Sequence, residues 1–376
     1  MSRKGENIYK RKDGRWEGRY IKLYDQTGKA KYGYVYARSY KEVKQKLINK
    51  IALIEKDCLC NKSNTLYGDF LDMWLQTLKI NIKESTYARY SYLIEKHIKP
   101  ILGNHQISRI STEIVENFIK NKLTSGSIKG NGPLSPKTVT DILTIVKSSM
   151  EHARYNDVFV LCNLSKLTIK QKNKEMRVLC KTEQEKLVSF LLKDMDLSKF
   201  GILLSLYTGI RVGELCALRW ENIDIDVSNA TLRIKKTMQR IQDTSINSAT
   251  KTKVIITEPK SKSSIRDIPI PDCIFPYVKR FKADQHAYVL TGDNTRYVEP
   301  RVLQYKFKRY ISICGIENAT YHTLRHTFAT RCIEVGFEIK SLSEILGHTN
   351  VNITLNRYVH SSFDLKYSNM NKLKFK

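Results

Sequence analysis

The chain has 376 residues, 41% of them hydrophobic, which is enough for two or three domains with buried cores. Its 65 Lys and Arg residues outnumber 37 Asp and Glu, and the net charge of +28 indicates a polyanionic partner, with nucleic acid the first candidate and an acidic membrane surface the second. No apolar run approaches the ~18 residues of a membrane span, and the N-terminus lacks the apolar stretch of a signal peptide, so we expect a cytoplasmic protein.

The first predicted unit, residues 1–57, is small and very basic. Residues 15–24 and 31–39 interleave aromatic and basic side chains and are joined by a segment of turn composition, and residues 40–56 have helical periodicity. We predict a short antiparallel sheet with one helix. Because successive strand residues point to opposite faces, Arg, Lys and aromatic side chains would gather on one face, which favours a DNA-binding sheet over an ordinary solvated surface.

The second predicted unit, residues 64–163, is helical. Four stretches have apolar residues at helical spacing, namely 66–78, 83–103, 111–126 and 137–156. Lys, Arg, Ser, Thr and Tyr on their polar faces could contact phosphates, but Lys-rich faces are also common on solvated helices. The charged stretch 164–179 has little core-forming pattern, and we predict a linker there.

The third predicted unit, residues 180–376, mixes helices and strands. Thr182 and Glu185 have the spacing of a capping box before an apolar run, and a nearly all-apolar helix further on would end at Gly209. Strand-like patterns follow, and helical patterns resume until about residue 345. The strand-like stretches are 230–236, 253–260 and 265–271.

Five short segments of the third unit carry polar residues inside apolar patterns. Arg211 follows the helix-ending Gly209 and opens a new helix, where backbone N–H groups favour an anion, and Glu214 is close enough to orient it. Taken singly, each segment also reads as a surface ion pair, a basic hairpin or ordinary packing. Together they supply, in chain order, Arg211, Glu214, Lys260, Lys262, His322, Arg325, His348 and Tyr358.

His322 and His326 have the i, i+4 spacing of a zinc-protease helix. Thr323 stands where that motif has its Glu, and a third ligand is lacking. The sequence also offers no carboxylate cluster for Mg²⁺ and no phosphate-binding glycine loop, and its closest cysteines, Cys58 and Cys60, are too tight for a C-x-x-C metal site. We therefore predict no metal and no cofactor, cysteines that are buried free thiols, and a structural, partly buried His326.

Metal-free chemistry on a phosphodiester suits these side chains. Two guanidiniums can neutralise the non-bridging oxygens at every working pH, and a tyrosine hydroxyl can attack phosphorus. A lysine can protonate the departing deoxyribose oxygen, and histidines can move protons or hold the phosphate.

The short sequence segments around these residues resemble those of the tyrosine recombinases, also called the phage integrase family. The matching segments are "TGIRVGELCAL", "HTLRHTFAT" and "LGHTNVNITLNRYVH", and the resemblance covers residues from about 65 to 360. The N-terminal unit resembles the arm-site-binding module of integrases from conjugative transposons and temperate phages. The implied fold is mainly α with small β-sheets, in three parts: an N-terminal β-sheet-plus-helix arm-binding module, a four-helix core-binding domain, and a mixed α+β catalytic domain of the tyrosine recombinase type.

The resemblance implies that Arg211 and Arg325 bind the scissile phosphate and that Tyr358 is the nucleophile. Attack would form a 3′-phosphotyrosyl link and free a 5′-hydroxyl. Tyr367 is the nearest alternative, but only Tyr358 lies in the "RYVH" context. The β-branched residues 351–355 read as a strand, whereas the family places a short helix there.

The remaining roles are likewise implied by the resemblance. His322 would act in proton transfer and His348 would support the phosphate. Lys260 would be the general acid, with Lys262 as the alternative, and Glu214 would be the supporting acidic residue.

The implied protein is a site-specific DNA recombinase that integrates and excises a mobile element. Its partners would be double-stranded DNA at core and arm sites and three further copies of itself in a synaptic homotetramer, and the free chain would be a monomer or weak oligomer. It would act on the nucleoid in the cytoplasm, and an excisionase and a host DNA-bending protein could assist. Two alternatives are a type IB topoisomerase-like strand transferase and a catalytically inactive DNA-binding protein.

Overall fold

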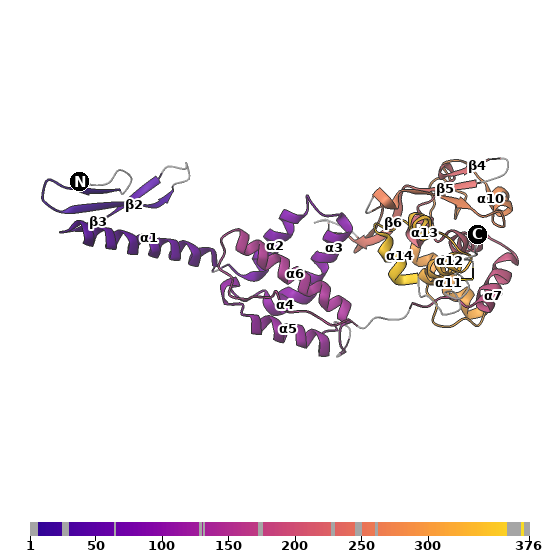
Figure 1. Cartoon of the computed structure of the whole chain (residues 1–376), viewed down its shortest axis with the longest axis horizontal. Helices are drawn as coiled ribbons and strands as arrows, with labels where there is room; N and C mark the ends of the chain where they lie inside the picture. Colours follow the sequence, from indigo (N-terminus) through magenta and orange to yellow (C-terminus); the bar gives the residue numbers. More distant parts are fainter. Residues whose placement is uncertain are drawn as a thin grey trace. The chain divides into compact units, whose positions relative to one another are not determined.

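A computed structural model describes the chain in two compact units, Met1–Lys172 and Asn173–Lys376. The described residues are 7–24, 30–63, 65–127, 130, 132–171, 176–226, 230–244, 250–259, 262–358 and 370–371. The expected fold class is confirmed, because small sheets accompany a majority of helices (Figure 1). Among the described residues, no helix is long and apolar enough to cross a membrane.

The first unit opens with the expected antiparallel sheet and helix. Strands β1 (Ile8–Lys10), β2 (Trp16–Tyr24) and β3 (Ala30–Ala37) pair in the order β1-β2-β3, and helix α1 (Tyr40–Ser63) follows (Figure 1). Strand residues on the face toward α1, together with residues of α1 itself, make a small apolar core. Its members are Ile8, Ala37, Val43 and Leu47, with Trp16, Tyr20, Val35 and Tyr40 packed against them.

The opposite face of this sheet carries aromatic and basic side chains. Tyr32, Tyr34 and Tyr36 alternate along β3 and are all exposed. The Arg19 guanidinium lies 3.4 Å from the centre of the Tyr32 ring, and Arg11 flanks the Tyr36 ring. The predicted gathering of arginines and aromatic rings on one face is therefore present.

The remainder of the first unit has helices in all four predicted stretches. They are α2 (Tyr67–Leu78), α3 (Glu84–Leu93) continued by a π-turn (Ile94–Ile98) and α4 (Lys99–Leu102), α5 (Thr112–Ser125) and α6 (Pro136–Tyr155), with a 3₁₀ turn at Ile107–Arg109. The π-turn comes just before Pro100, which has no N–H to continue the α-helical ladder. Ser111 and Ser135 cap α5 and α6 by accepting from backbone N–H groups one turn ahead.

The second unit begins with helices α7 (Lys181–Leu192), α8 (Leu197–Thr208) and α9 (Val212–Cys216). The capping box of α7 differs from the predicted pair. Cys180, rather than Thr182, is the N-cap, and its backbone N–H donates to Glu183 at 2.9 Å. Cys180 and Cys273 are exposed and Cys314 is half-buried, so the prediction of buried thiols is wrong for these three. Cys162, Cys216 and Cys332 are buried free thiols as expected. The Cys58 and Cys60 side chains lie outside the described residues.

Two small sheets follow these helices. Strands β4 (Ile223–Ile225), β5 (Ala230–Ile234) and β8 (Arg266–Ile270) pair in the order β4-β5-β8, and β6 (Thr237–Gln242) pairs with β7 (Thr252–Thr257). The predicted strands correspond to β5, β7 and β8. Short 3₁₀ turns lie at Trp220–Asn222 and Lys262–Ser264.

Five helices complete the second unit: α10 (Phe275–Phe281), α11 (Pro300–Ile313), α12 (Tyr321–Glu334), α13 (Ile339–Leu346) and α14 (Val351–Tyr358). The β-branched stretch before Tyr358 is thus helical, as the family resemblance implied. An extensive apolar core, whose buried members run from Leu179 to Leu324, supports this unit, and α8 lies almost wholly inside it.

Candidate active site

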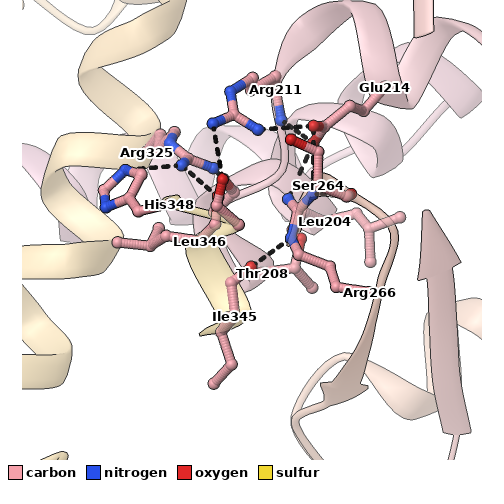
Figure 2. A network of polar contacts seen from close by, with 12 residues as sticks. Leu204, Thr208, Arg211, Glu214, Ser264, Arg266, Arg325, Ile345, Leu346 and His348 are labelled. Atoms are coloured by element: carbon pink, nitrogen blue, oxygen red, sulfur yellow. Dashed lines mark hydrogen bonds and ion pairs between the residues drawn. The ribbon is translucent and has the colours of Figure 1, made fainter. Parts of the chain in front are cut away.

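Arg325 occupies the centre of a polar cluster in the second unit (Figure 2). Its helix, α12, begins after Thr320, whose backbone N–H donates to Thr323 Oγ1 at 3.0 Å. One turn further on, Arg325 is only 2% exposed. Its Nη1 donates to Gly209 O at 2.8 Å, and its Nη2 contacts Leu346 O and lies 3.1 Å from His348 Nε2.

Arg211 lies at the start of α9, directly after the turn that ends α8. Gly209 ends that helix with φ of 65°, a left-handed conformation that a side chain disfavours. The Arg211 backbone N–H donates to Glu214 Oε2 at 3.0 Å, and Nη1 donates to Glu214 Oε1 at 2.8 Å. Its Nη2 reaches Gly347 O at 3.5 Å, and 37% of the side chain stays exposed.

Arg266, on β8, is part of the same network and was missed in the sequence (Figure 2). Its Nη2 and Nη1 donate to the two oxygens of Glu214 at 2.9 and 3.2 Å. Burial alone would raise the pKa of Glu214, but the hydrogen bonds and charge of Arg266, with the charge of Arg211, outweigh it and lower that pKa to about 2. The carboxylate therefore stays ionised between two arginines.

The cluster nevertheless has an excess of positive charge. Burial, reinforced by the charges of Arg211 and Arg266, lowers the pKa of Arg325 to about 9, so the guanidinium is still protonated at neutral pH. Glu214 compensates one of these cations. An anion bound at the exposed edge of Arg211 would relieve the remaining repulsion.

Tyr358, at the end of α14, has its hydroxyl within hydrogen-bond distance of a histidine. His326 Nδ1 lies 2.8 Å from Tyr358 Oη, and Tyr358 is 7% exposed. His322 is exposed, and its ring centre lies 4.5 Å from that of His326 in an edge-on contact. The sequence assigned proton transfer to His322 and a structural role to His326, whereas the histidine in contact with the tyrosine is His326.

His348 links the arginine cluster to α14. Its Nε2 lies 3.1 Å from Arg325 Nη2, and its Nδ1 lies 2.9 Å from Thr354 Oγ1. Lys260 lies outside the described residues. Lys262 begins the 3₁₀ turn before β8, and its side chain is also outside them. Arg211, Glu214, Arg325 and His348 thus lie together, and the position of the two candidate lysines relative to them stays a prediction.

Two residues among the groups in contact, Arg266 and His326, were not in the predicted set. Arg266 had a signal in the sequence, because Arg266, Ile268 and Ile270 alternate along one strand and the last two are apolar, so the arginine faces inward with them. No comparable signal marked His326, since its apolar neighbours also fit an ordinary buried histidine. Among the described residues, no group of three or more His, Cys, Asp or Glu side chains could hold a metal ion.

Two family models match the chain. The model described as phage integrase family matches residues 174–364, and the model described as phage integrase, N-terminal SAM-like domain, matches residues 66–123. The first match contains every predicted site residue, from Arg211 to Tyr358.

Similarity to individual proteins extends over most of the chain. A tyrosine recombinase described as XerC-like, from Caldanaerobacter subterraneus subsp. tengcongensis, is 26% identical over 359 residues, 89% of this chain and 90% of the relative. The structure of the Tn1549 transposon integrase in complex with a circular intermediate DNA has a TM-score of 0.64 at 22% identity, covering 82% of this chain and 100% of that one. A lambda integrase tetramer bound to a Holliday junction has a TM-score of 0.58 at 16% identity, covering 95% and 97%. Both structural likenesses show the shared fold.

Proposed function

Because the chain belongs to the phage integrase family, we propose that it is a tyrosine-type site-specific DNA recombinase that integrates and excises a mobile genetic element. One observation carries this proposal: Arg211 and Arg325 donate to neighbouring carbonyls at the carboxyl end of α13. The same unit also holds Tyr358, whose hydroxyl is hydrogen-bonded. Phosphoryl transfer depends mainly on positioning and charge stabilisation, which fixed guanidiniums supply.

In the proposed first step, Arg211 and Arg325 hold the non-bridging oxygens of the scissile phosphate, and His348 supports them. Tyr358 Oη attacks phosphorus, the bond from phosphorus to the 5′-oxygen breaks, and a 3′-phosphotyrosyl link forms. In the second step, the 5′-hydroxyl of another strand attacks the same phosphorus and releases the tyrosine. One phosphodiester is exchanged for another, so no external energy source is required.

Two protons move in each cleavage. The Tyr358 proton passes to a histidine: His326 contacts the hydroxyl, and His322 is the residue that the family resemblance implies. The departing 5′-oxygen takes its proton from Lys260, with Lys262 as the alternative donor. Glu214 orients Arg211 by accepting from its backbone and side chain, and the negative charge of the carboxylate would repel a phosphate.

We propose that the parts of the chain divide the work of DNA binding. Residues 1–57 bind arm sites, residues 64–163 bind the core site, residues 164–179 link the two units, and residues 180–376 carry out strand transfer. The exposed tyrosines and arginines of the N-terminal sheet support the first assignment. The net charge of +28 supplies phosphate affinity that should fall steeply with salt.

Strand exchange between two duplexes requires four active sites, so we propose a homotetramer on DNA and a monomer or weak oligomer without it. The lambda integrase tetramer on a Holliday junction supports this assembly for the shared fold. We further propose that the protein acts on the nucleoid in the cytoplasm, and that an excisionase and a host DNA-bending protein set the direction of the reaction.

A suicide-substrate assay tests the proposed function. DNA from the ends of the element that encodes this chain, nicked so that a short fragment diffuses away after cleavage, should trap a denaturant-resistant protein–DNA adduct with a free 5′-hydroxyl. The adduct should form at the same rate in EDTA. A chain that binds this DNA but forms no adduct, or cleaves only with added metal, would contradict the proposal.

The sheet of the first unit offers a separate prediction. Arg11 and Arg15 flank the Tyr36 ring at 5.5 and 5.8 Å, so Tyr36→Ala should remove an exposed ring between two cations and weaken arm-site binding about tenfold. Core-site cleavage should stay unchanged. Fluorescence anisotropy on arm and core duplexes measures both affinities. Tyr155→Ala removes an 86% exposed tyrosine at the end of α6, outside the proposed arm-binding residues, and as the control it should leave arm-site affinity unchanged. Equal losses on both duplexes would argue against an arm-specific sheet.

A further inference from the structure

The carboxyl end of α13 contacts three different arginines. A helix leaves its last carbonyls without intrahelical partners, and the helix dipole gives that end a partial negative charge. Ile345 O accepts from Arg266 Nε, and the next two carbonyls accept from the other two guanidiniums (Figure 2). These contacts are Leu346 O with Arg325 and Gly347 O with Arg211.

The two preceding carbonyls of α13 are satisfied by the backbone itself. Gly347 N donates to Glu344 O at 2.9 Å, and His348 N donates to Ser343 O at 3.0 Å. Gly347 makes this turn with φ of 63°, and a Cβ there would lie 3.1 Å from the Arg266 guanidinium. The backbone turn and Arg266 therefore fit against each other, which leaves the carbonyls of residues 345–347 directed at the arginines.

Arg266 links two parts of this cluster, the carboxyl end of α13 and the Glu214 carboxylate. Its side chain is 5% exposed, against 37% for Arg211. On one side it donates to Ile345 O, and on the other it forms a two-point ion pair with Glu214. Since Glu214 also accepts from the backbone and side chain of Arg211, a displacement of Arg266 would be transmitted to Arg211 through two contacts.

We propose that Arg266 is a positioning residue for strand transfer, which locks Glu214 to the carboxyl end of α13 and thereby fixes where Arg211 and Arg325 present their guanidiniums. This inference rests on the proposed function, since it assigns a role within that reaction. Arg266 Nη1 also donates to Ser264 O at 3.0 Å, so the same side chain fixes the end of the turn that Lys262 begins. Lysine cannot replace it, because one ammonium lacks the planar fork that reaches a carboxylate and a carbonyl together.

The test compares Arg266→Met and Arg266→Lys with the wild-type chain on the suicide substrate at saturating DNA. Both variants should bind core DNA within about twofold of wild type but cleave about 100-fold more slowly, which is the scale of a misplacement of roughly 1 Å at a reacting group. Arg233→Gln is the matched control. It removes an exposed arginine of β5 that pairs with Asp267, the neighbour of Arg266 on β8, and cleavage should stay within about twofold of wild type.

A double-mutant cycle separates positioning from general support of the fold. If Arg266 acts through Arg211, adding Arg266→Met to Arg211→Ala should slow cleavage by less than about threefold, so the two single losses should not multiply. A full 100-fold further loss, or a loss of DNA affinity equal to the loss of rate, would overturn the inference. If Arg266→Met does not fold, Arg266→Lys supplies the same cycle.

The wild-type result distinguishes a failure of the proposed function from a failure of the positioning role. A wild-type chain without adduct contradicts the function itself. An active wild-type chain with Arg266 variants that cleave at full rate contradicts only the positioning role.

Discussion

Tyr358→Phe should abolish the covalent protein–DNA adduct, lowering its rate of formation by at least about 10⁴-fold, while core DNA is still bound. The substitution removes the hydroxyl oxygen, which is the proposed nucleophile, and leaves the ring. That ring packs in a small core with Ala329, Cys332, Leu342 and Leu346, so the fold should be retained. Adduct formation is measured on denaturing gels with the nicked substrate, and binding is measured by anisotropy.

Tyr367→Phe is the control for this experiment. Tyr367 was the nearest alternative in the sequence and lies outside the described residues. Its variant should form the adduct at the wild-type rate. An adduct that survives in Tyr358→Phe and disappears in Tyr367→Phe would make Tyr367 the nucleophile. An adduct that survives in both variants would exclude both tyrosines as the nucleophile.

The contact between His326 and Tyr358 illustrates what sequence reasoning can miss. His322 and Arg325 are three residues apart, a spacing that places two side chains on one face of a helix. In the structure α12 turns Arg325 and His326 inward together, while His322 is exposed. The histidine on the tyrosine hydroxyl depends on where α14 packs against α12, which is a tertiary contact without a local signal.

Local signals did predict the elements that position the arginines. The helix end predicted at Gly209 is the end of α8, because a cap satisfies backbone groups within one turn of the chain and so leaves a local signal. Other elements were set by packing. Strand β6 was not predicted, since its burial depends on pairing with β7 across a polar insertion, and the cap of α7 is Cys180, a residue type that ordinary capping preferences rank low.

Arg266 lies between these two cases. The alternation of β8 placed it on the inward face, so its burial could be predicted from the strand pattern alone. Its partner could not, because Glu214 is 52 residues away in the sequence and already had a partner in Arg211. Sequence reasoning therefore found one ion pair where the structure has a carboxylate shared by two arginines.

Glu214→Gln should lower the free energy of unfolding of the second unit by about 3–5 kcal/mol at pH 7. Glu214 is 3% exposed, and its two oxygens accept from both Arg211 and Arg266. The amide keeps the shape of the side chain but removes the charge, which leaves two guanidiniums uncompensated beside Arg325. Urea unfolding followed by amide hydrogen exchange in α8 and α9 measures the change in this unit.

The same carboxylate gives the prediction a pH dependence. Its pKa is lowered from 4.5 to about 2 in the folded chain, so its stabilising effect is complete above about pH 4.5 and is lost as the pH falls through about 2. Over that interval the wild-type chain should lose roughly 3 kcal/mol that the Gln variant lacks from the start. The stability curves of the two chains should therefore converge on acidification.

Asp267→Asn is the control, because it removes the charge of an exposed carboxylate instead of a buried one. Asp267 also pairs with an arginine in the same unit, but both side chains of the Arg233–Asp267 pair are about half exposed, and water already solvates the charges. The Asn variant should therefore unfold almost like wild type at every pH. Similar losses in both variants would mean that burial does not decide the strength of these pairs. A Glu214→Gln chain as stable as wild type would mean that the three arginines tolerate one another without the carboxylate, and the account of how the phosphate-binding cluster is held together would then be wrong.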